Sequence, residues 1–334
     1  MGDMTVVGDM ILQAQAKLNL TLNILGKRTD GYHDIESVVQ SIDLFDRIYL
    51  KTGLPVPVRR GNEEINIKVT CNDTSIPMGR GNLAVDAACA LAEFAGLRAS
   101  VEINIEKGIP VAAGLGGGSA DAAAVLVGLN QLWRLNLSPS ELMVVGERLG
   151  ADIPFCVKGG TGIIRGKGEI VESLPTPCDL WFVVVILQDR ISTAQAYAAF
   201  DRLAETTGVY DAALNVADVT SRMVQSIRAG KVENIAGCLT NALEQAALSI
   251  VPSIAGVKHI LLAQGAAGVG MSGSGPTVFA IADSRAKAEA IRAALTWASC
   301  GGRPKGTSSG GASVSRVIKE VFVCQAISWG VAYR

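Results

Sequence analysis

A glycine-rich segment, GIPVAAGLGGGSADAAA at residues 108–124, most constrains how this chain can fold. Residues 101–106 before it alternate with the period of two that is typical of a half-buried strand. After it comes a long apolar run with helical spacing, for which Ser119 or Asp121 would be a suitable N-cap. The glycines therefore form a loop between a strand and a helix N-terminus. Such a loop can present backbone N–H groups to a phosphate, so binding of a nucleoside triphosphate is the first hypothesis.

The two commonest phosphate-binding motifs do not fit this sequence. A Walker A loop ends in Gly-Lys-Ser/Thr, but Lys167 is followed by Gly168 and Thr161 stands at the first glycine position. The dinucleotide fingerprint G-x-G-x-x-G lacks its third glycine at Ser119 and lies far from the first strand. A dehydrogenase is therefore a remote alternative. A turn that only lets the chain bend is another, but short connections seldom need so many glycines.

The composition is that of a chain that can bury a sizeable core and form two domains, with 334 residues of which 49% are hydrophobic. A formal net charge of −1 predicts no nucleic-acid and no membrane partner. Seven cysteines without a C-x-x-C pair, and only two histidines, predict reduced thiols in a cytoplasmic protein and no zinc site. The first residues lack the basic region of a signal peptide. The uncharged stretch at 260–282 is interrupted by glycines and Pro276, which argues against a membrane span.

The order of predicted elements indicates an α+β fold with two layers per domain. Strands are expected within residues 16–50, around a charged turn at 26–31, and at 101–106, 181–187, 276–282 and 317–323. Helices are expected at 83–97, after the glycine-rich loop, from the capping box at Ser138 to about Gly150, and at 194–205, 217–248 and 285–298. We expect an N-terminal domain at 1–165 with the glycine-rich loop, a C-terminal domain at 166–334, and a flexible connector at 299–313.

Three blocks of sequence together resemble the GHMP kinases, which include galactokinase, homoserine kinase and mevalonate kinase. They are Ala16–Leu20 with Asp30–His33, residues 110–120 with 150–154, and Met271–Pro276. The resemblance runs from about residue 14 to 332. It implies a two-domain GHMP-kinase-like fold with the active site in the cleft between the domains. It also implies that ATP, with Mg²⁺, phosphorylates a hydroxyl group of a small molecule.

Within that family, the lysine–asparagine strand combined with the D-G-Y-H turn is most similar to one branch. Its substrate is a polyol that carries a cytidine diphosphate group, and the Ser192–Tyr197 segment strengthens the match. The sequence departs from the family pattern at Gln15, Gln188 and Ala242. None of these departures removes a group with an obvious chemical role.

The resemblance assigns chemistry to two residues. Asp152 matches the family's catalytic aspartate, which would accept the proton of the attacking hydroxyl. Lys17 matches the lysine beside it, whose charge would keep that carboxylate ionised. From the sequence alone, Asp152 could equally be the N-cap of a helix that starts at Pro154, and the two roles can coexist. Lys17 could be a solvated residue of an edge strand, although its apolar neighbours argue against this.

The resemblance also implies a substrate pocket. Asn19 would hydrogen-bond the polyol, and Thr193 would be a further polar contact. Tyr32 would stack on the cytosine ring, His33 would hydrogen-bond its edge, and Tyr197 would close the other face. Without the resemblance, Tyr32 and His33 would be interpreted as a turn tyrosine and a surface histidine.

For ATP, the resemblance implies that the backbone of the glycine-rich loop holds the phosphates. The residues concerned are Pro110, Val111, Ala112, Ala113, Gly114, Leu115, Gly116, Gly117, Gly118, Ser119 and Ala120. Asn82 and Lys107 are secondary candidates near the nucleotide. Ser119 could reach Mg²⁺, for which the sequence assigns no carboxylate. Gly273, Ser274 and Gly275 would shape the floor of the active site, and they also form a tight turn before the next strand.

Two other functions stay open. Another small-molecule GHMP kinase, of the homoserine or mevalonate type, would give no reason for a Tyr32–His33–Tyr197 clamp. A catalytically silent nucleotide-binding regulator on the same fold would not need Lys17 and Asp152, and both are present. The sequence makes no prediction of the oligomeric state.

Overall fold

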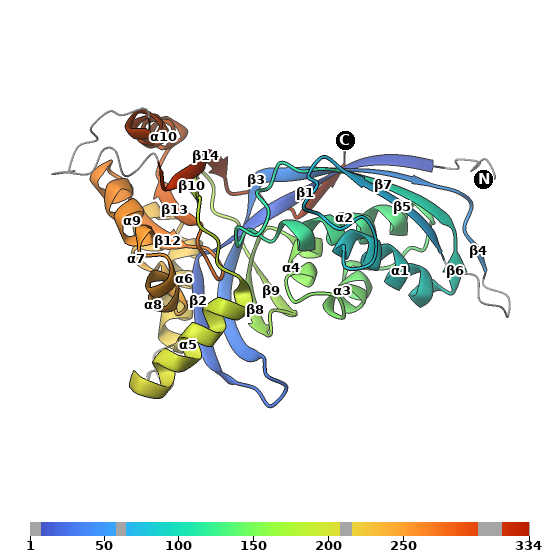
Figure 1. The fold of residues 1–334 in the computed structure, drawn as a ribbon, viewed down its shortest axis with the longest axis horizontal. Coiled ribbons are helices and arrows are strands. Elements are labelled where there is room, and N and C mark those ends of the chain that lie inside the picture. The colour runs from blue at the N-terminus through green and yellow to red at the C-terminus, as the bar shows by residue number, and fades with distance from the viewer. Residues whose placement is uncertain (1–7, 58–64, 208–215, 300–315, 334) are drawn as a thin grey trace.

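The structure, a computed structural model, describes residues 8–57, 65–207, 216–299 and 316–333. Nearly all of the expected connector at 299–313 therefore lies outside the described residues. The chain forms a nine-stranded sheet, a four-stranded sheet and a two-stranded ribbon. Helices cover both larger sheets (Figure 1). The mixture of layered sheets and helices confirms the expected α+β class.

The nine-stranded sheet is organised around one long central strand, β3 (His33–Thr52). Its antiparallel neighbours are β1 (Gly8–Asn19), β2 (Thr21–Lys27), β7 (Ser100–Glu106) and β8 (Thr161–Gly166). Outer positions are taken by β5 (Asn66–Cys71), β9 (Ile170–Leu174), β11 (Thr240–Asn241) and β15 (Val331–Tyr333). The ribbon is β4 (Val56–Pro57) with β6 (Leu97–Arg98). Strands are therefore present where the sequence predicted them around the 26–31 turn.

Four helices of the first half of the chain form a layer on the nine-stranded sheet. They are α1 (Leu83–Ala95), α2 (Gly117–Leu132), α3 (Pro139–Glu147) and α4 (Ile153–Lys158). Within this layer, α3 packs on the other three helices. Helix α2 lies against β1 and β3 so closely that a Cβ at Gly128 would come 2.5 Å from Leu50 Cδ1. The capping box of Ser138 and Glu141 is confirmed, and α1 ends at Gly96, whose backbone is left-handed.

The helix N-terminus after the glycine-rich loop differs from the prediction. Neither Ser119 nor Asp121 is the N-cap, because α2 begins one turn earlier and Gly116 takes that position. Gly116 has a φ of 72°, and a Cβ there would come 3.0 Å from Lys17 Cγ, so both its conformation and its surroundings favour glycine. No side chain caps α2. Its first N–H groups are therefore left for a ligand.

The four-stranded antiparallel sheet has the order β12 (Gly268–Met271), β13 (Val278–Ala282), β10 (Trp181–Leu187) and β14 (Ile318–Gln325). Helices α9 (Ser253–Ala263) and α10 (Arg285–Ser299) pack on it, and α5 (Thr193–Thr207) contributes buried side chains to the same apolar cluster. The prediction that residues 217–248 are helical throughout is wrong. The segment forms α6 (Val216–Ala229), α7 (Val232–Gly237), β11 and α8 (Glu244–Ile250), because Gly230 turns left-handed at φ 64° and β11 pairs with β2.

Two clusters of buried apolar side chains hold these layers together. One combines the nine-stranded sheet and α1–α4 with one face of the four-stranded sheet, and the other combines the opposite face of the four-stranded sheet with its helices and with residues of β2, β3 and β8. Among the described residues, no single helix has the length and apolar character needed to cross a bilayer. Helices α8 and α9 meet those criteria only as a pair, with a bend of 116° between them.

Candidate active site

A cleft of about 450 Å³ gathers most of the residues that the sequence singled out. Its walls include Lys17 and Asn19 of β1, Asp152 before α4, and Thr193 and Tyr197 of α5. The loop from Pro110 to Ser119 and the Gly273–Ser274 turn complete it. Segments far apart in the sequence thus meet where the N-terminus of α2 faces the end of β1.

Lys17 and Asp152 form a close charged pair on this wall. Lys17 Nζ lies 3.4 Å from Asp152 Oδ2 and donates to Asn19 Oδ1 at 2.7 Å. Lys17 is buried, whereas the Asp152 side chain keeps 35% of its surface exposed. Asp152 stands at the N-cap position of α4, but its side chain makes no capping hydrogen bond. Its carboxylate is therefore available to a ligand in the cleft.

Asn19 is fixed from three sides. Its Nδ2 donates to Ser37 Oγ at 2.8 Å, and its backbone N–H donates to Ser272 Oγ at 3.3 Å. Ser272 in turn donates to the carbonyl of Gly114 at 3.0 Å, which joins β1 to both glycine loops. Sequence reasoning missed Ser37 and Ser272. Ser272 lies inside the MSGSGP block, where only the three following residues were singled out.

The two glycine loops pack backbone against backbone. A Cβ at Gly114 would come 2.6 Å from the Ser272 carbonyl oxygen, and one at Gly273 would come 3.2 Å from the Gly114 oxygen. Asn241, also missed, donates from Nδ2 to the carbonyls of Met271 and Gly273, both at 2.9 Å. The second loop therefore supports the first.

The residues expected around a cytosine ring divide between two neighbouring places. His33 is buried and stacks on Tyr197, with ring centroids 4.7 Å apart. Its Nε2 lies 2.8 Å from Asp201 Oδ1, a partner that the sequence did not indicate although Asp201 is four residues beyond Tyr197 on α5. Burial, with a smaller effect of Asp152, raises the pKa of Tyr197 to about 12, so its hydroxyl stays protonated. Thr193 Oγ1 lies 3.3 Å from Ser274 Oγ and links α5 to the second loop.

Tyr32 lies in an adjoining cavity of about 370 Å³. Its side chain is 61% exposed, and Lys167 Nζ sits 5.2 Å from its ring centroid. Ala151 and Lys167 line both cavities, so the two lie next to each other at these residues. The sequence gave Lys167 no role beyond ruling out a Walker A loop.

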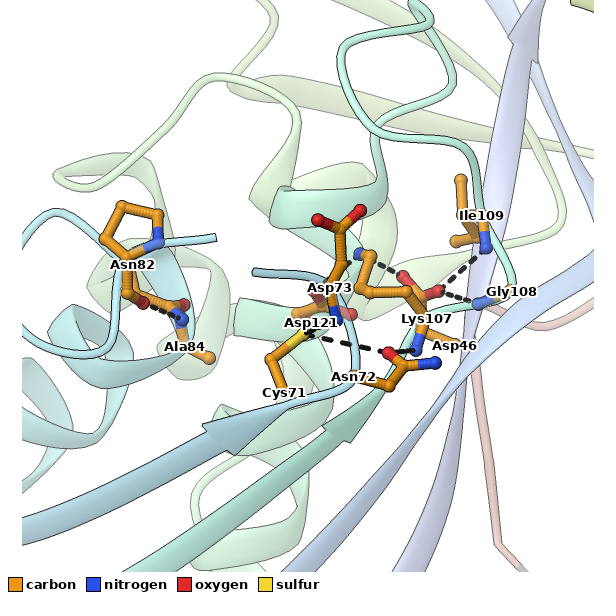
Figure 2. Close-up of polar contacts among 11 residues, drawn as sticks. Asp46, Cys71, Asn72, Asp73, Asn82, Ala84, Lys107, Gly108, Ile109 and Asp121 are labelled. Atoms are coloured by element: carbon orange, nitrogen blue, oxygen red, sulfur yellow. Dashed lines mark hydrogen bonds and ion pairs between the residues drawn. The ribbon is translucent and has the colours of Figure 1, made fainter. Parts of the chain in front are cut away.

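Lys107 and Asn82, the secondary candidates for nucleotide binding, differ in their position relative to the cleft. Lys107 lines the cleft, but its ammonium group donates to Asp46 and, at 2.8 Å, to Asp121 Oδ2. Asn82 is the N-cap of α1, where its Oδ1 accepts from the Ala84 N–H at 3.0 Å (Figure 2). The cleft is lined by the next residue, Leu83, rather than by Asn82.

The residues present suit a magnesium ion that arrives with a nucleotide rather than one held by the protein alone. Within the described ranges, no three His, Cys, Asp or Glu side chains lie close enough together to hold a metal. Ser119, in the first turn of α2, lines the cleft together with Asp152. Magnesium bound to phosphates usually needs only one or two protein oxygens, and the Ser119 hydroxyl is placed to offer one.

Comparison with known proteins gives matches to both halves of the chain. The profile for the GHMP kinases N terminal domain matches residues 82–160, and that for the GHMP kinases C terminal matches residues 223–298. The 4-diphosphocytidyl-2-C-methyl-D-erythritol kinase of Pelotomaculum thermopropionicum is 44% identical over 80% of this chain and 87% of its own. The enzyme of the same name from Gloeobacter violaceus is 42% identical over 85% and 89%.

Solved structures show the same likeness. A crystal structure of 4-(cytidine 5'-diphospho)-2C-methyl-D-erythritol kinase is 31% identical, covers 85% of this chain and 96% of its own, and superposes with a TM-score of 0.63. A homoserine kinase from Cytophaga hutchinsonii superposes with a TM-score of 0.74 over all of both chains at 19% identity. At that identity, the second likeness concerns the fold alone.

Proposed function

Since the chain belongs to the GHMP kinases, and among them to the 4-diphosphocytidyl-2-C-methyl-D-erythritol kinase family, we propose the reaction that this name describes. The chain transfers the γ-phosphate of ATP to the 2-hydroxyl of 4-diphosphocytidyl-2-C-methyl-D-erythritol, a step of the non-mevalonate isoprenoid pathway. One observation carries this proposal. The Lys17–Asp152 pair faces the same cleft as an uncapped helix N-terminus and its glycine-rich loop.

In this proposal Asp152 is the general base. Phosphoryl transfer needs positioning and charge neutralisation more than covalent chemistry by the protein. The Asp152 carboxylate accepts the proton of the acceptor hydroxyl as that oxygen attacks phosphorus. Lys17 has three N–H donors, and Asn19 and Asp152 are its two acceptors among the described residues. The third donor is left for the transferred phosphoryl group.

The phosphates of ATP lie on the loop from Pro110 to Ala120 in this proposal. The N–H groups of the first turn of α2 lack side-chain caps and carry the positive end of the helix dipole. The substrate is ATP with Mg²⁺, which neutralises phosphate charge. The Ser119 hydroxyl is the protein oxygen that would join its shell, while Asp152 stays available as the base.

The acceptor occupies the other end of the cleft. Asn19 is held beside the catalytic pair and hydrogen-bonds the polyol, with Thr193 as a further contact. The cytosine ring lies between the Tyr32 cavity and the stacked pair of His33 and Tyr197. Because His33 Nε2 is paired with Asp201, the other ring nitrogen of His33 is the one left for the edge of the cytosine.

Two further parts of the proposal concern the whole protein. We place the reaction in the cytoplasm, and the thiols of Cys71, Cys156, Cys178, Cys238 and Cys324 support this because none of these five forms a disulfide. We also keep a division into domains at 1–165 and 166–334. The chain passes from the large sheet to the small one between β9, which ends at Leu174, and β10, which begins at Trp181, so the sheets themselves favour a boundary a little later in the sequence.

A coupled assay of ADP release tests the proposal. The protein is given ATP and Mg²⁺ with 4-diphosphocytidyl-2-C-methyl-D-erythritol, and in parallel with homoserine or mevalonate. We expect turnover with the cytidyl substrate alone. Turnover with homoserine or mevalonate instead would replace the proposal by another small-molecule kinase. ATP binding without turnover on any of the three would favour a silent regulator.

A further inference from the structure

A buried ionic cluster lies beneath the start of the glycine-rich loop, and the reaction above does not use it. It consists of Asp46 on β3, Lys107 directly after β7, and Asp121 in the second turn of α2, and we name it the Lys107 cluster (Figure 2). The three side chains are at most 7% exposed. Burying three charged groups is costly unless they are paired, so a cluster of this kind needs a physical reason.

Asp46 is the centre of this cluster. Its Oδ1 accepts from the backbone N–H groups of Gly108 and Ile109, at 2.7 and 2.8 Å, and its Oδ2 accepts from the Lys107 ammonium. These are the first peptide groups of the glycine-rich loop. A Cβ at Gly108 would come 2.5 Å from the Phe45 carbonyl oxygen, so the loop leaves β7 pressed against β3.

Asp121 closes the other end of the same loop. Its Oδ2 accepts from Lys107 Nζ at 2.8 Å, so the ammonium joins the last residue before the loop to the helix that follows it. A Cβ at Gly117, the first residue of α2, would come 3.3 Å from the same Nζ. Asn72 adds a further hydrogen bond, since its Oδ1 accepts from the Lys107 backbone N–H at 2.8 Å. Both ends of the phosphate loop thus meet at one ammonium group.

The charge of the cluster suits a site for an anionic ligand. With both carboxylates ionised it would carry one net negative charge beneath the phosphates. Burial, followed by the nearby Asp46 carboxylate, raises the pKa of Asp121 well above its usual range. Burial lowers the pKa of Lys107, but the two carboxylates outweigh it and raise that pKa above its usual value. Both shifts favour a proton on the cluster, which would reduce its negative charge beneath the loop.

We propose that Asp46 and Asp121 are positioning residues for ATP. Through Lys107 and the first two N–H groups of the loop, they hold both ends of the phosphate-binding loop in the shape that accepts the triphosphate. The inference rests on the proposed function for its ligand. It differs from direct contact of Lys107 with the nucleotide, because it assigns the effect to the carboxylates and predicts that all three residues act as one unit.

The test compares Asp46→Asn, Lys107→Met and the double variant with the matched control Glu106→Gln. Glu106 precedes Lys107 and pairs with Arg47 at 3.2 Å, but that ion pair is exposed. For Asp46→Asn we expect the KM for ATP, and the Kd for Mg-ATP measured by calorimetry without acceptor, to rise roughly ten-fold. The KM for the cytidyl substrate should stay within about two-fold, and the control should match wild type.

Non-additivity separates the proposal from its alternatives. We expect the double variant to bind Mg-ATP no more weakly than Lys107→Met alone, because both changes break the same unit. Normal ATP affinity of Asp46→Asn beside weak binding by Lys107→Met would overturn the proposal in favour of direct contact by Lys107. Equal losses for both substrates would also overturn it, in favour of a general role in folding.

A replacement variant and a binding measurement without acceptor keep the result decisive. If Asp46→Asn does not fold, the isosteric Asp121→Asn takes its place, with a rise of roughly three-fold in the Kd for Mg-ATP and the same non-additivity with Lys107→Met. Unchanged ATP binding by that variant would contradict the proposed role of the Lys107 cluster in positioning the loop. Absence of turnover by wild type would contradict the proposed function alone, since the calorimetric measurement tests the cluster without any acceptor.

Discussion

At the scale of single residues, the proposed chemistry depends on a carboxylate that makes no capping hydrogen bond and lines the cleft beside Lys17. Asp152 occupies an N-cap position, where an aspartate commonly bonds the helix backbone, yet its side chain faces Lys17 instead. Its two interpretations from the sequence therefore turn out to concern different parts of the residue. The backbone starts α4, and the side chain lines the cleft.

We expect Asp152→Asn to lower kcat by about 10²-fold or more, because the amide cannot accept the proton of the attacking hydroxyl. The fold should persist, since the side chain is 35% exposed and caps nothing. The measurements are kcat in the ADP-release assay and Mg-ATP binding by calorimetry. Asp283→Asn, at an exposed ion pair on the four-stranded side, is the control. An unchanged kcat for Asp152→Asn would remove its role as base.

Tyr32→Ala should act on the other end of the substrate. A stacked aromatic ring contributes about 1–3 kcal/mol per base, so the KM for the cytidyl substrate should rise by roughly 5- to 150-fold. The KM for ATP should not change, because Tyr32 lies in the cavity beside the cleft rather than at the glycine-rich loop. Tyr333→Ala, at a comparably exposed tyrosine on β15, is the control. An effect confined to ATP would contradict this placement.

How much of the site the sequence could predict depends on whether its contacts are local or distant. Lys17 and Asn19 were predictable as a pair, because alternate residues of a strand share a face. Asp201 and Ser272 were missed, since each acts on a residue more than 150 positions away in the sequence. No spacing along a single strand or helix carries such information.

At the scale of elements, the same distinction explains the outcome for the fold. The helix at 83–97 and the capping box at Ser138 were predicted correctly because their signals lie within a few residues. The start of α2 was placed too late, since good capping residues at Ser119 and Asp121 were present but a left-handed glycine took the position. Glycine is favoured at this position because the side chain of Lys17, on strand β1, lies close to it.

The close packing of the two glycine loops makes a prediction at this scale. Gly114→Ala should weaken Mg-ATP binding and lower the free energy of unfolding by about 1–3 kcal/mol, because Gly114 has a φ of 73°. The added Cβ would also meet the Ser272 oxygen at 2.6 Å. Gly79→Ala is the control, since nothing lies within 4 Å of its Cβ position. Urea unfolding and calorimetry measure both effects, and equal behaviour of the two variants would refute the argument.

At the scale of the whole molecule, elements from both ends of the chain complete one site. The late strands β11 and β15 join the sheet built by the first half, and the turn at Gly273–Ser274 closes the cleft that β1 and α2 begin. Long-range pairings of this kind cannot be deduced from periodicity, which gives each element but not its partners. The expectation of two domains with a site between them came from the family resemblance, whereas the order of the predicted elements indicated only the α+β fold class.

At the same scale, we expect the Lys107 cluster to make the free energy of unfolding depend on pH. Asp121 has a higher pKa in the folded chain than its ordinary 3.8, because it is buried and lies near Asp46. Lys107 is the cation that faces it, and Cys71 of β5 is a nearby thiol whose own pKa burial raises. From about pH 4 upward the folded state keeps a proton that the unfolded state has lost. The free energy of unfolding therefore falls as the pH rises through this window.

Asp121→Asn removes that titration and so provides the measurement. Urea unfolding of both proteins at several values from roughly pH 5 to 8 should show wild type losing stability relative to the variant as the pH rises. Asp283→Asn is the matched control, because the pKa of Asp283 is lowered by its contacts with Ser284 and Lys287. Its contribution is already complete above its ordinary pKa and should not vary over this range. A constant difference between wild type and Asp121→Asn would show that the folded chain holds no extra proton at the cluster.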